Sequence, residues 1–119
     1  MAFIQKIVRN ERELIDIAIK YYSIMNILHN LDIPTRQIQL LAFTAVRGTI
    51  TPQPARDEFV KLFSSSLASI ENMKGKLYKK GLLIESNDMY KVNPDILPDF
   101  SQENYIFQLY INLLSENDS

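Results

Sequence analysis

The residues that could carry out catalysis are few and lie far apart in the sequence. The single histidine, His29, ends an apolar stretch, and the chain has no cysteine with which it could share a metal ion. Asp57 and Glu58 fall in the first turn of an expected helix, where the helix dipole favours acids without any catalytic role. The three glycines are too widely spaced for a phosphate-binding loop. We therefore expect a non-enzymatic protein with no metal ion, no cofactor and no small-molecule substrate.

A second group of residues has the chemistry of a binding surface rather than of an active site. An asparagine can pair with adenine and lysines can contact phosphate, so residues 67–80 offer a possible nucleic-acid or partner contact at Ala68, Asn72, Lys76, Lys79 and Lys80. Glu71 on the same face opposes DNA binding, as does the absence of arginine from this segment. The alternative is that the lysines form an ordinary solvated helix face.

Gly75 falls in the middle of this exposed helix. A glycine there costs about 0.5–1 kcal/mol relative to alanine, so a structural reason for keeping it is expected. Close approach of a partner's backbone or of a bulky side chain would supply that reason, and drift at an exposed site is the alternative. We assign Gly75 to a partner interface.

Composition and charge limit the classes of function. The chain has 119 residues, 46% of them hydrophobic, which predicts one globular domain. No apolar run approaches the roughly 18 residues of a membrane span, and no signal peptide is evident. The lack of cysteine fits a reducing compartment. Residues 33–92 carry nine basic and five acidic groups, whereas residues 93–119 carry five acids and no base, which suggests two different surfaces.

The elements that must position these residues start with a strand at 2–8 and a long helix. The helix begins at a capping box formed by Asn10 and Glu13 and runs to about Asn30. Its apolar residues recur at steps of three and four, which predicts a buried stripe of Leu14, Ala18, Tyr21, Met25 and Leu28, with Ile17 and Ile24 beside it. A helix so apolar is either the central core helix or is shared with another subunit.

Residues 33–94 predict three further helices and a hairpin. Thr35 is expected to cap a helix over 36–47 that stops at Gly48, and a short helix follows over 55–63. The next helix covers 67–80 and ends at Gly81, with its inward side chains predicted to be Leu67, Ile70, Met73 and Leu77. Strands at 82–86 and 89–93 are joined by Asn87 and Asp88, a pair suited to a tight hairpin turn.

The C-terminal part, residues 95–119, predicts an acidic linker and a strand at 104–114. Alternation places four apolar side chains on one face, which we assign to a partner interface: Phe107, Leu109, Ile111 and Leu113. A helix remains open as an alternative, with its apolar face formed by Ile106, Leu109, Tyr110 and Leu113. Apolar strand edges left free invite aggregation, so both terminal strands are expected to be covered in an assembly.

The order helix, helix, helix, two-stranded wing resembles the winged helix-turn-helix family. The resemblance rests on TRQIQLLAF at 35–43, SLASIENMKGKLYKKGLLIE at 66–85 and YKVNP at 90–94, about half of the chain. It implies an α+β fold with a winged-helix core at 33–94, preceded by a strand and an apolar helix at 1–32 and followed by the C-terminal extension at 95–119. Because one fold hosts many functions, it does not by itself imply DNA binding.

A narrower resemblance is to small winged-helix-like virion proteins of tailed bacteriophages, above all the crAss-like phages of gut bacteria. KLYKKGLLI at 76–84 and NYIFQLYINL at 104–113 carry it. It implies a neck, ring or tail component of a virion made in the host cytoplasm, oligomeric and bound to protein partners, with no membrane association. The alternative is a cytoplasmic, sequence-specific DNA-binding regulator of the winged-helix type.

Overall fold

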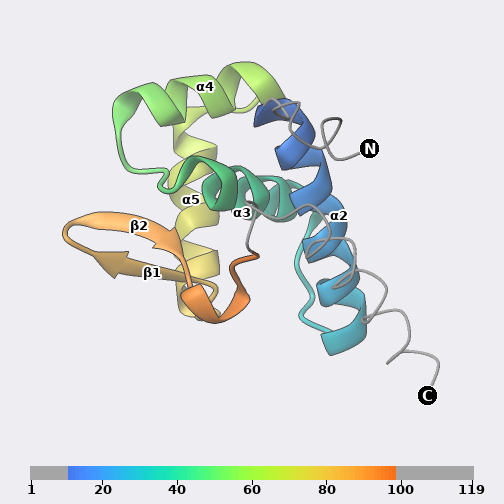
Figure 1. The fold of residues 1–119 in the computed structure, drawn as a ribbon. Coiled ribbons are helices and arrows are strands. Elements are labelled where there is room, and N and C mark those ends of the chain that lie inside the picture. Colours follow the sequence, from blue (N-terminus) through green and yellow to red (C-terminus); the bar gives the residue numbers. More distant parts are fainter. Residues whose placement is uncertain (1–10, 99–119) are drawn as a thin grey trace, which may run out of the picture.

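The computed structural model describes residues 11–98, and these fold into four helices, a two-stranded antiparallel sheet and a short 3-10 turn (Figure 1). In chain order they are α2 (Glu11–His29), α3 (Thr35–Arg47), α4 (Gln53–Phe63), α5 (Leu67–Lys79), β1 (Leu83–Ser86), β2 (Met89–Val92) and η1 (Pro94–Ile96). This α+β architecture is compatible with a winged-helix arrangement. The strands predicted at 2–8 and 104–114 lie outside the described residues.

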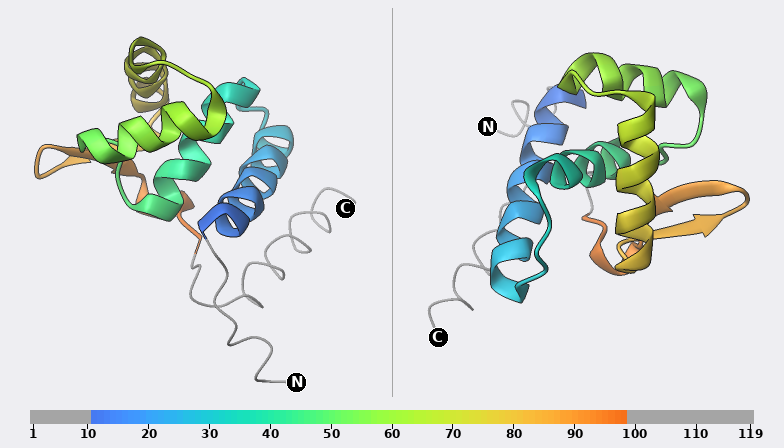
Figure 2. Two further views of the ribbon diagram at one scale, coloured as in Figure 1. Left: turned by 90° about the horizontal axis from the view of Figure 1, so that it is seen from above. Right: turned by 180° about the vertical axis from the view of Figure 1, so that it is seen from behind.

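The centre of the fold is α3, which lies between α2 and α5 in each view (Figures 1 and 2). Its apolar face of Ile38, Leu41, Ala42 and Ala45 is buried, and Leu40, Phe43 and Thr44 on the remaining sides are buried too. The Phe43 ring meets the edge of the α4 ring of Phe59 at a centroid distance of 5.4 Å. Of the two alternatives for the helix near 11–30, the central core helix is not what the described residues show, because α2 packs extensively against α3 only, whereas α3 contacts α2, α4, α5 and β2.

The long helix α2 presents a different stripe to the core from the one that the sequence predicts. Its buried side chains are Ile15, Ala18, Tyr22 and Met25, of which only Ala18 and Met25 belong to the predicted set. The two stripes are adjacent on the helix and both are apolar, so periodicity alone could not choose between them. The Tyr22 hydroxyl also donates a hydrogen bond of 2.8 Å to the carbonyl oxygen of Ile96, which joins the end of the described chain to α2.

Most helix ends follow their sequence signals. Gly48 and Gly81 adopt the positive φ angles, 100° and 78°, that favour glycine after a helix. At the start of α3, Pro34 takes the N-cap position and makes no side-chain bond, so Thr35 is the first helical residue and not the predicted cap. The next helix, α4, begins at Gln53 rather than at residue 55, because a proline is well tolerated in the first helical turn.

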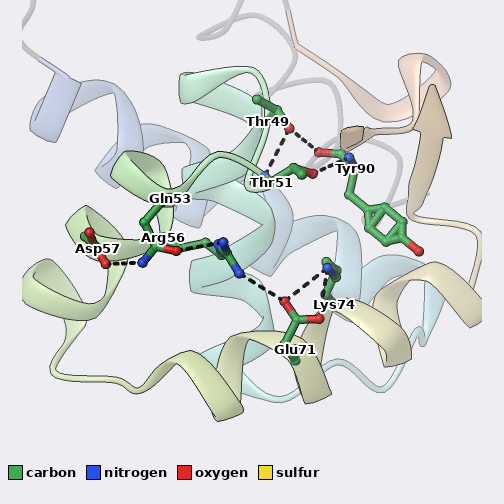
Figure 3. Close-up of polar contacts among 8 residues, drawn as sticks. All are labelled: Thr49, Thr51, Gln53, Arg56, Asp57, Glu71, Lys74 and Tyr90. Atoms are coloured by element: carbon green, nitrogen blue, oxygen red, sulfur yellow. Dashed lines mark hydrogen bonds and ion pairs between the residues drawn. The ribbon is translucent and has the colours of Figure 1, made fainter. Parts of the chain in front are cut away.

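The hairpin forms with the predicted turn. Asn87 and Asp88 both have positive φ angles, 54° and 63°, as a two-residue turn between twisted strands requires, and Leu83 pairs with Val92 at the base. The outer edge of β2 is bonded to the loop after α3: the Thr49 hydroxyl donates to the Tyr90 carbonyl oxygen at 2.9 Å, and the Tyr90 amide donates to the Thr51 hydroxyl at 2.7 Å (Figure 3). These bonds fix the hairpin to the helical body.

Candidate functional site

The helix α5 is positioned by a cap at its start and by packing along one side. The Ser66 hydroxyl accepts a hydrogen bond of 3.1 Å from the amide of Ser69, which satisfies one of the free N–H groups of the first turn. Ile70, Met73 and Leu77 are buried, as predicted. Leu67, predicted to face inward, is 43% exposed, because it is the first helical residue and lies at the margin of the packed face.

The opposite side of α5 faces solvent and contains the binding residues that the sequence singled out. Ala68, Asn72, Lys76 and Lys79 are exposed, and Gly75 is half-buried. A methyl group added at Gly75 would meet no atom within 4 Å, so no contact among the described residues explains the absence of a side chain there. We call these five residues the solvent face of α5.

Lys80 has a contact that the sequence did not predict. Its ammonium group donates hydrogen bonds of 2.9 Å to the carbonyl oxygens of Leu31 and Asp32, in the loop between α2 and α3. The side chain therefore ties the end of α5 to that loop, although it was assigned with its neighbours to a partner or nucleic-acid contact. Nothing in the sequence links positions so far apart.

Glu71 does not present an uncompensated charge. Its carboxylate accepts from the Lys74 ammonium group at 3.0 Å and lies 3.7 Å from the Arg56 guanidinium of α4 (Figure 3). Arg56 in turn donates to Gln53, which donates to Asp57, so a row of polar contacts runs from α4 to α5 (Figure 3). The argument that Glu71 would repel phosphate therefore loses force, because its charge is balanced by two cations.

Aromatic contacts connect the hairpin to α5. The rings of Tyr78 and Tyr90 stack with centroids 5.5 Å apart, and the Lys74 ammonium group lies 4.4 Å from the centre of the Tyr90 ring. Tyr78 is 47% exposed, so the stack borders solvent. The four-residue spacing of Lys74 and Tyr78 could have shown that they share a helix face. Only the packing of the hairpin against α5 shows that Tyr90 lies beside them.

The hairpin and the end of α3 border a hollow of about 270 Å³. Its wall is mostly apolar and combines the end of α3, both strands and the segment after them: Thr44, Ala45, Gly48, Ile84, Ser86, Lys91, Val92, Pro94 and Leu97. Such a hollow is large enough for one or two apolar side chains and offers no pair of acid and base for chemistry. It is a mostly apolar depression beside the hairpin.

The described residues offer little for catalysis. Between residues 11 and 98, no three His, Cys, Asp or Glu side chains gather where they could hold a metal ion. His29 is exposed at the end of α2. Burial, with a smaller contribution from the neighbouring Tyr21, raises the pKa of the Tyr22 phenol above its usual value, and that hydroxyl is engaged in the core rather than at a surface site. No described helix combines the length and apolar character needed to cross a bilayer.

The predicted interface residues Phe107, Leu109, Ile111 and Leu113 lie outside the described residues, so their role stays a prediction. Comparisons with protein families, curated proteins and solved structures found no match for this chain. The solvent face of α5 is thus the candidate functional site, identified from its own geometry.

Proposed function

We propose that this chain is a non-enzymatic interaction module of the winged-helix type that binds a protein partner through the solvent face of α5. The observation that carries the proposal is that two of the five positions on that face hold very small residues. Ala68 and Gly75 lie on it, and the space above Gly75 is open. A helix or loop of a partner can approach such positions closely, and the cores of protein interfaces are packed as densely as protein interiors.

The chemistry of the same surface favours a protein over DNA. Reading base edges requires side chains that donate or accept hydrogen bonds, and of Ala68, Asn72 and Gly75 only Asn72 has one. The hairpin adds acids at Glu85 and Asp88, where a DNA-binding wing would present basic residues. Residues 11–98 carry 11 basic and 10 acidic side chains, a net charge of +1, which is low for a domain that binds phosphate backbones.

The assembly that we propose is the particle of a tailed bacteriophage, with the chain as a neck, ring or tail component. The support is the sequence resemblance carried by residues 76–84 and 104–113. In the structure the first of these segments spans the end of α5, its glycine stop and the start of β1. Lys76 and Lys79 of this segment lie on the solvent face of α5 that we assign to the partner, whereas its three leucines are buried.

A second candidate function, sequence-specific DNA binding, is favoured by one observation. With Glu71 balanced by Arg56 and Lys74, the charges left on the solvent face of α5 are those of Lys76 and Lys79. These two lysines could contact phosphates, and Asn72, which lies nearer the start of the helix, could contact one base. This candidate predicts nanomolar, sequence-selective binding at about 150 mM salt.

The test uses co-expression with the proteins encoded by neighbouring genes, followed by size-exclusion chromatography. We expect one of them to co-elute with the wild-type chain. Gly75→Arg should abolish co-elution without lowering the thermal transition, because it places a bulky side chain where the partner approaches. Asp57→Arg, on the exposed side of α4, is the matched control and should co-elute normally.

A mobility-shift titration at two salt concentrations separates the candidates. A protein module should bind DNA only weakly and without sequence preference. Tight, sequence-selective binding that Lys76→Glu with Lys79→Glu abolishes would overturn the proposal in favour of the regulator.

A further inference from the structure

The two faces of the hairpin have different surroundings. Side chains of directly paired residues share a face, and they alternate between faces along each strand. The register therefore places four side chains on one face: Ile84, Ser86, Met89 and Lys91. Tyr90 lies on the opposite face, where its ring stacks on Tyr78 of α5. We call the face that contains Lys91 the outer face of the hairpin, because it is turned away from that stack.

The outer face of the hairpin forms one wall of the hollow of about 270 Å³, to which it contributes Ile84, Ser86 and Lys91. Leu97, which also lines the hollow, is 44% exposed, and Met89, which pairs with Ser86, is 38% exposed. These are two of the five large apolar side chains that are exposed among residues 11–98. Apolar side chains gathered around a depression are typical of an interaction site.

The hollow has one sign of charge. Lys91 is the one charged residue in its lining, and it is half-buried. No hydrogen bond or ion pair joins the Lys91 ammonium group to another residue between 11 and 98, and this includes Asp88 and Asp95, the acids nearest to it in sequence. An ammonium group among apolar walls has lost part of its hydration, so a carboxylate placed beside it would accept a charge-assisted hydrogen bond. The hollow is therefore complementary to an apolar group that has an acid next to it.

We propose that the hollow binds an apolar side chain of a protein partner, and that Lys91 pairs with an aspartate or glutamate adjacent to that side chain in the partner's sequence. Pockets for small ligands usually enclose roughly 300–1,000 Å³, so this hollow is small for such a ligand. A single apolar side chain of a partner commonly fills a pocket of this kind at the centre of an interface. Met89 and Leu97 would extend the contact beyond the hollow. This site lies apart from the solvent face of α5 and does not depend on the function proposed for that face.

Selection of random displayed peptides on the full chain tests the proposal, followed by NMR titration of the chain with a synthetic copy of a selected peptide. We expect the selected peptides to share an aliphatic or aromatic residue next to an acid. The backbone amide shifts that change on titration should include those of Gly48, Ile84 and Lys91, which line the hollow.

Charge substitutions give the sharper readout. Lys91→Glu should weaken binding of the selected peptide by about tenfold or more, because two like charges then meet. The same variant should prefer a peptide in which lysine replaces the acid. Lys91→Met keeps the apolar part of the side chain and should weaken binding without this reversal. Lys79→Glu makes the same charge change on the solvent face of α5, so as the matched control it should bind like the wild type.

Several results would overturn the proposal. One is a selection that enriches no peptide, or only peptides without an acid. Equal weakening by Lys79→Glu would indicate a general attraction between net charges. Shift changes confined to the solvent face of α5 would assign the peptides to that face. Dodecanoate that binds in the hollow more tightly than every selected peptide would point to a small apolar acid as the ligand. Dimerisation that Lys91→Glu abolishes would assign the hollow to a second copy of the chain. None of these results bears on co-elution and its loss in Gly75→Arg, which test the function proposed for α5.

Discussion

α2 and α5 each pack an apolar stripe against α3, yet their remaining sides differ in chemistry. Outside its buried stripe, α2 carries further large apolar side chains that are half-buried, among them Ile17, Ile24 and Leu28, whereas the solvent face of α5 combines small side chains with Asn72 and two lysines. Apolar side chains gain stability from shielding whether or not a partner is bound. A polar face is stable in water and becomes buried only when a partner binds. This difference is the reason why we propose the solvent face of α5, rather than α2, for recognition.

The largest effect on the free energy of unfolding is expected where α5 packs against the core. Leu77 is fully buried, so Leu77→Ala should lower the free energy of unfolding by about 2–5 kcal/mol through lost apolar contact and a cavity. Lys76→Ala, one residue away on the solvent face, should change it by less than about 0.5 kcal/mol. Urea denaturation of both variants measures the contrast. Equal losses would show that the two sides of α5 do not differ as described.

A smaller effect is expected on the core side of α2. Tyr22→Phe removes the hydrogen bond to the Ile96 carbonyl oxygen and should cost about 0.5–1.5 kcal/mol near neutral pH. Urea denaturation at neutral pH measures this effect. An unchanged free energy of unfolding would contradict the contribution of this hydrogen bond.

The same residue predicts a dependence on alkaline pH. Burial raises the pKa of Tyr22, so the folded state keeps the phenol protonated while the unfolded state releases its proton above about pH 10. The resulting stabilisation is complete below the unfolded pKa and is lost as the pH rises above it. Between about pH 8 and about pH 11, the free energy of unfolding should therefore fall more steeply with pH for the wild type than for Tyr22→Phe. Parallel curves would contradict the assignment.

The smallest effect on stability is expected on the solvent face of α5. Gly75→Ala should stabilise the isolated chain by about 0.5–1 kcal/mol, because alanine is the better helix former and its methyl group enters open space. Gly81→Ala is the informative contrast. The backbone there has a φ of 78°, so the same change should destabilise the chain. Thermal denaturation of both variants distinguishes these opposite signs. Destabilisation by Gly75→Ala would mean that the site is more crowded than the structure shows.

Local signals in the sequence determined several ends of the described elements, although α3 and α4 begin one and two residues earlier than predicted. Gly48, Gly81 and the pair Asn87 and Asp88 marked two helix ends and the hairpin turn, because their backbone angles depend on residue type more than on surroundings. The buried side chains Ile70, Met73 and Leu77 were also predicted, since α5 has one apolar stripe and only one way to bury it.

Tertiary structure decided what periodicity left open. On α2 two adjacent apolar stripes compete, and the position of α3 selects the one containing Ile15 and Tyr22. The charge on Glu71 is balanced by Arg56 of another helix, and Lys80 is held by carbonyl oxygens nearly fifty residues earlier in the chain. Contacts of this kind depend on how helices cross in space. The sequence therefore determined the helices and the turn, and packing determined which of their surfaces remain exposed to solvent.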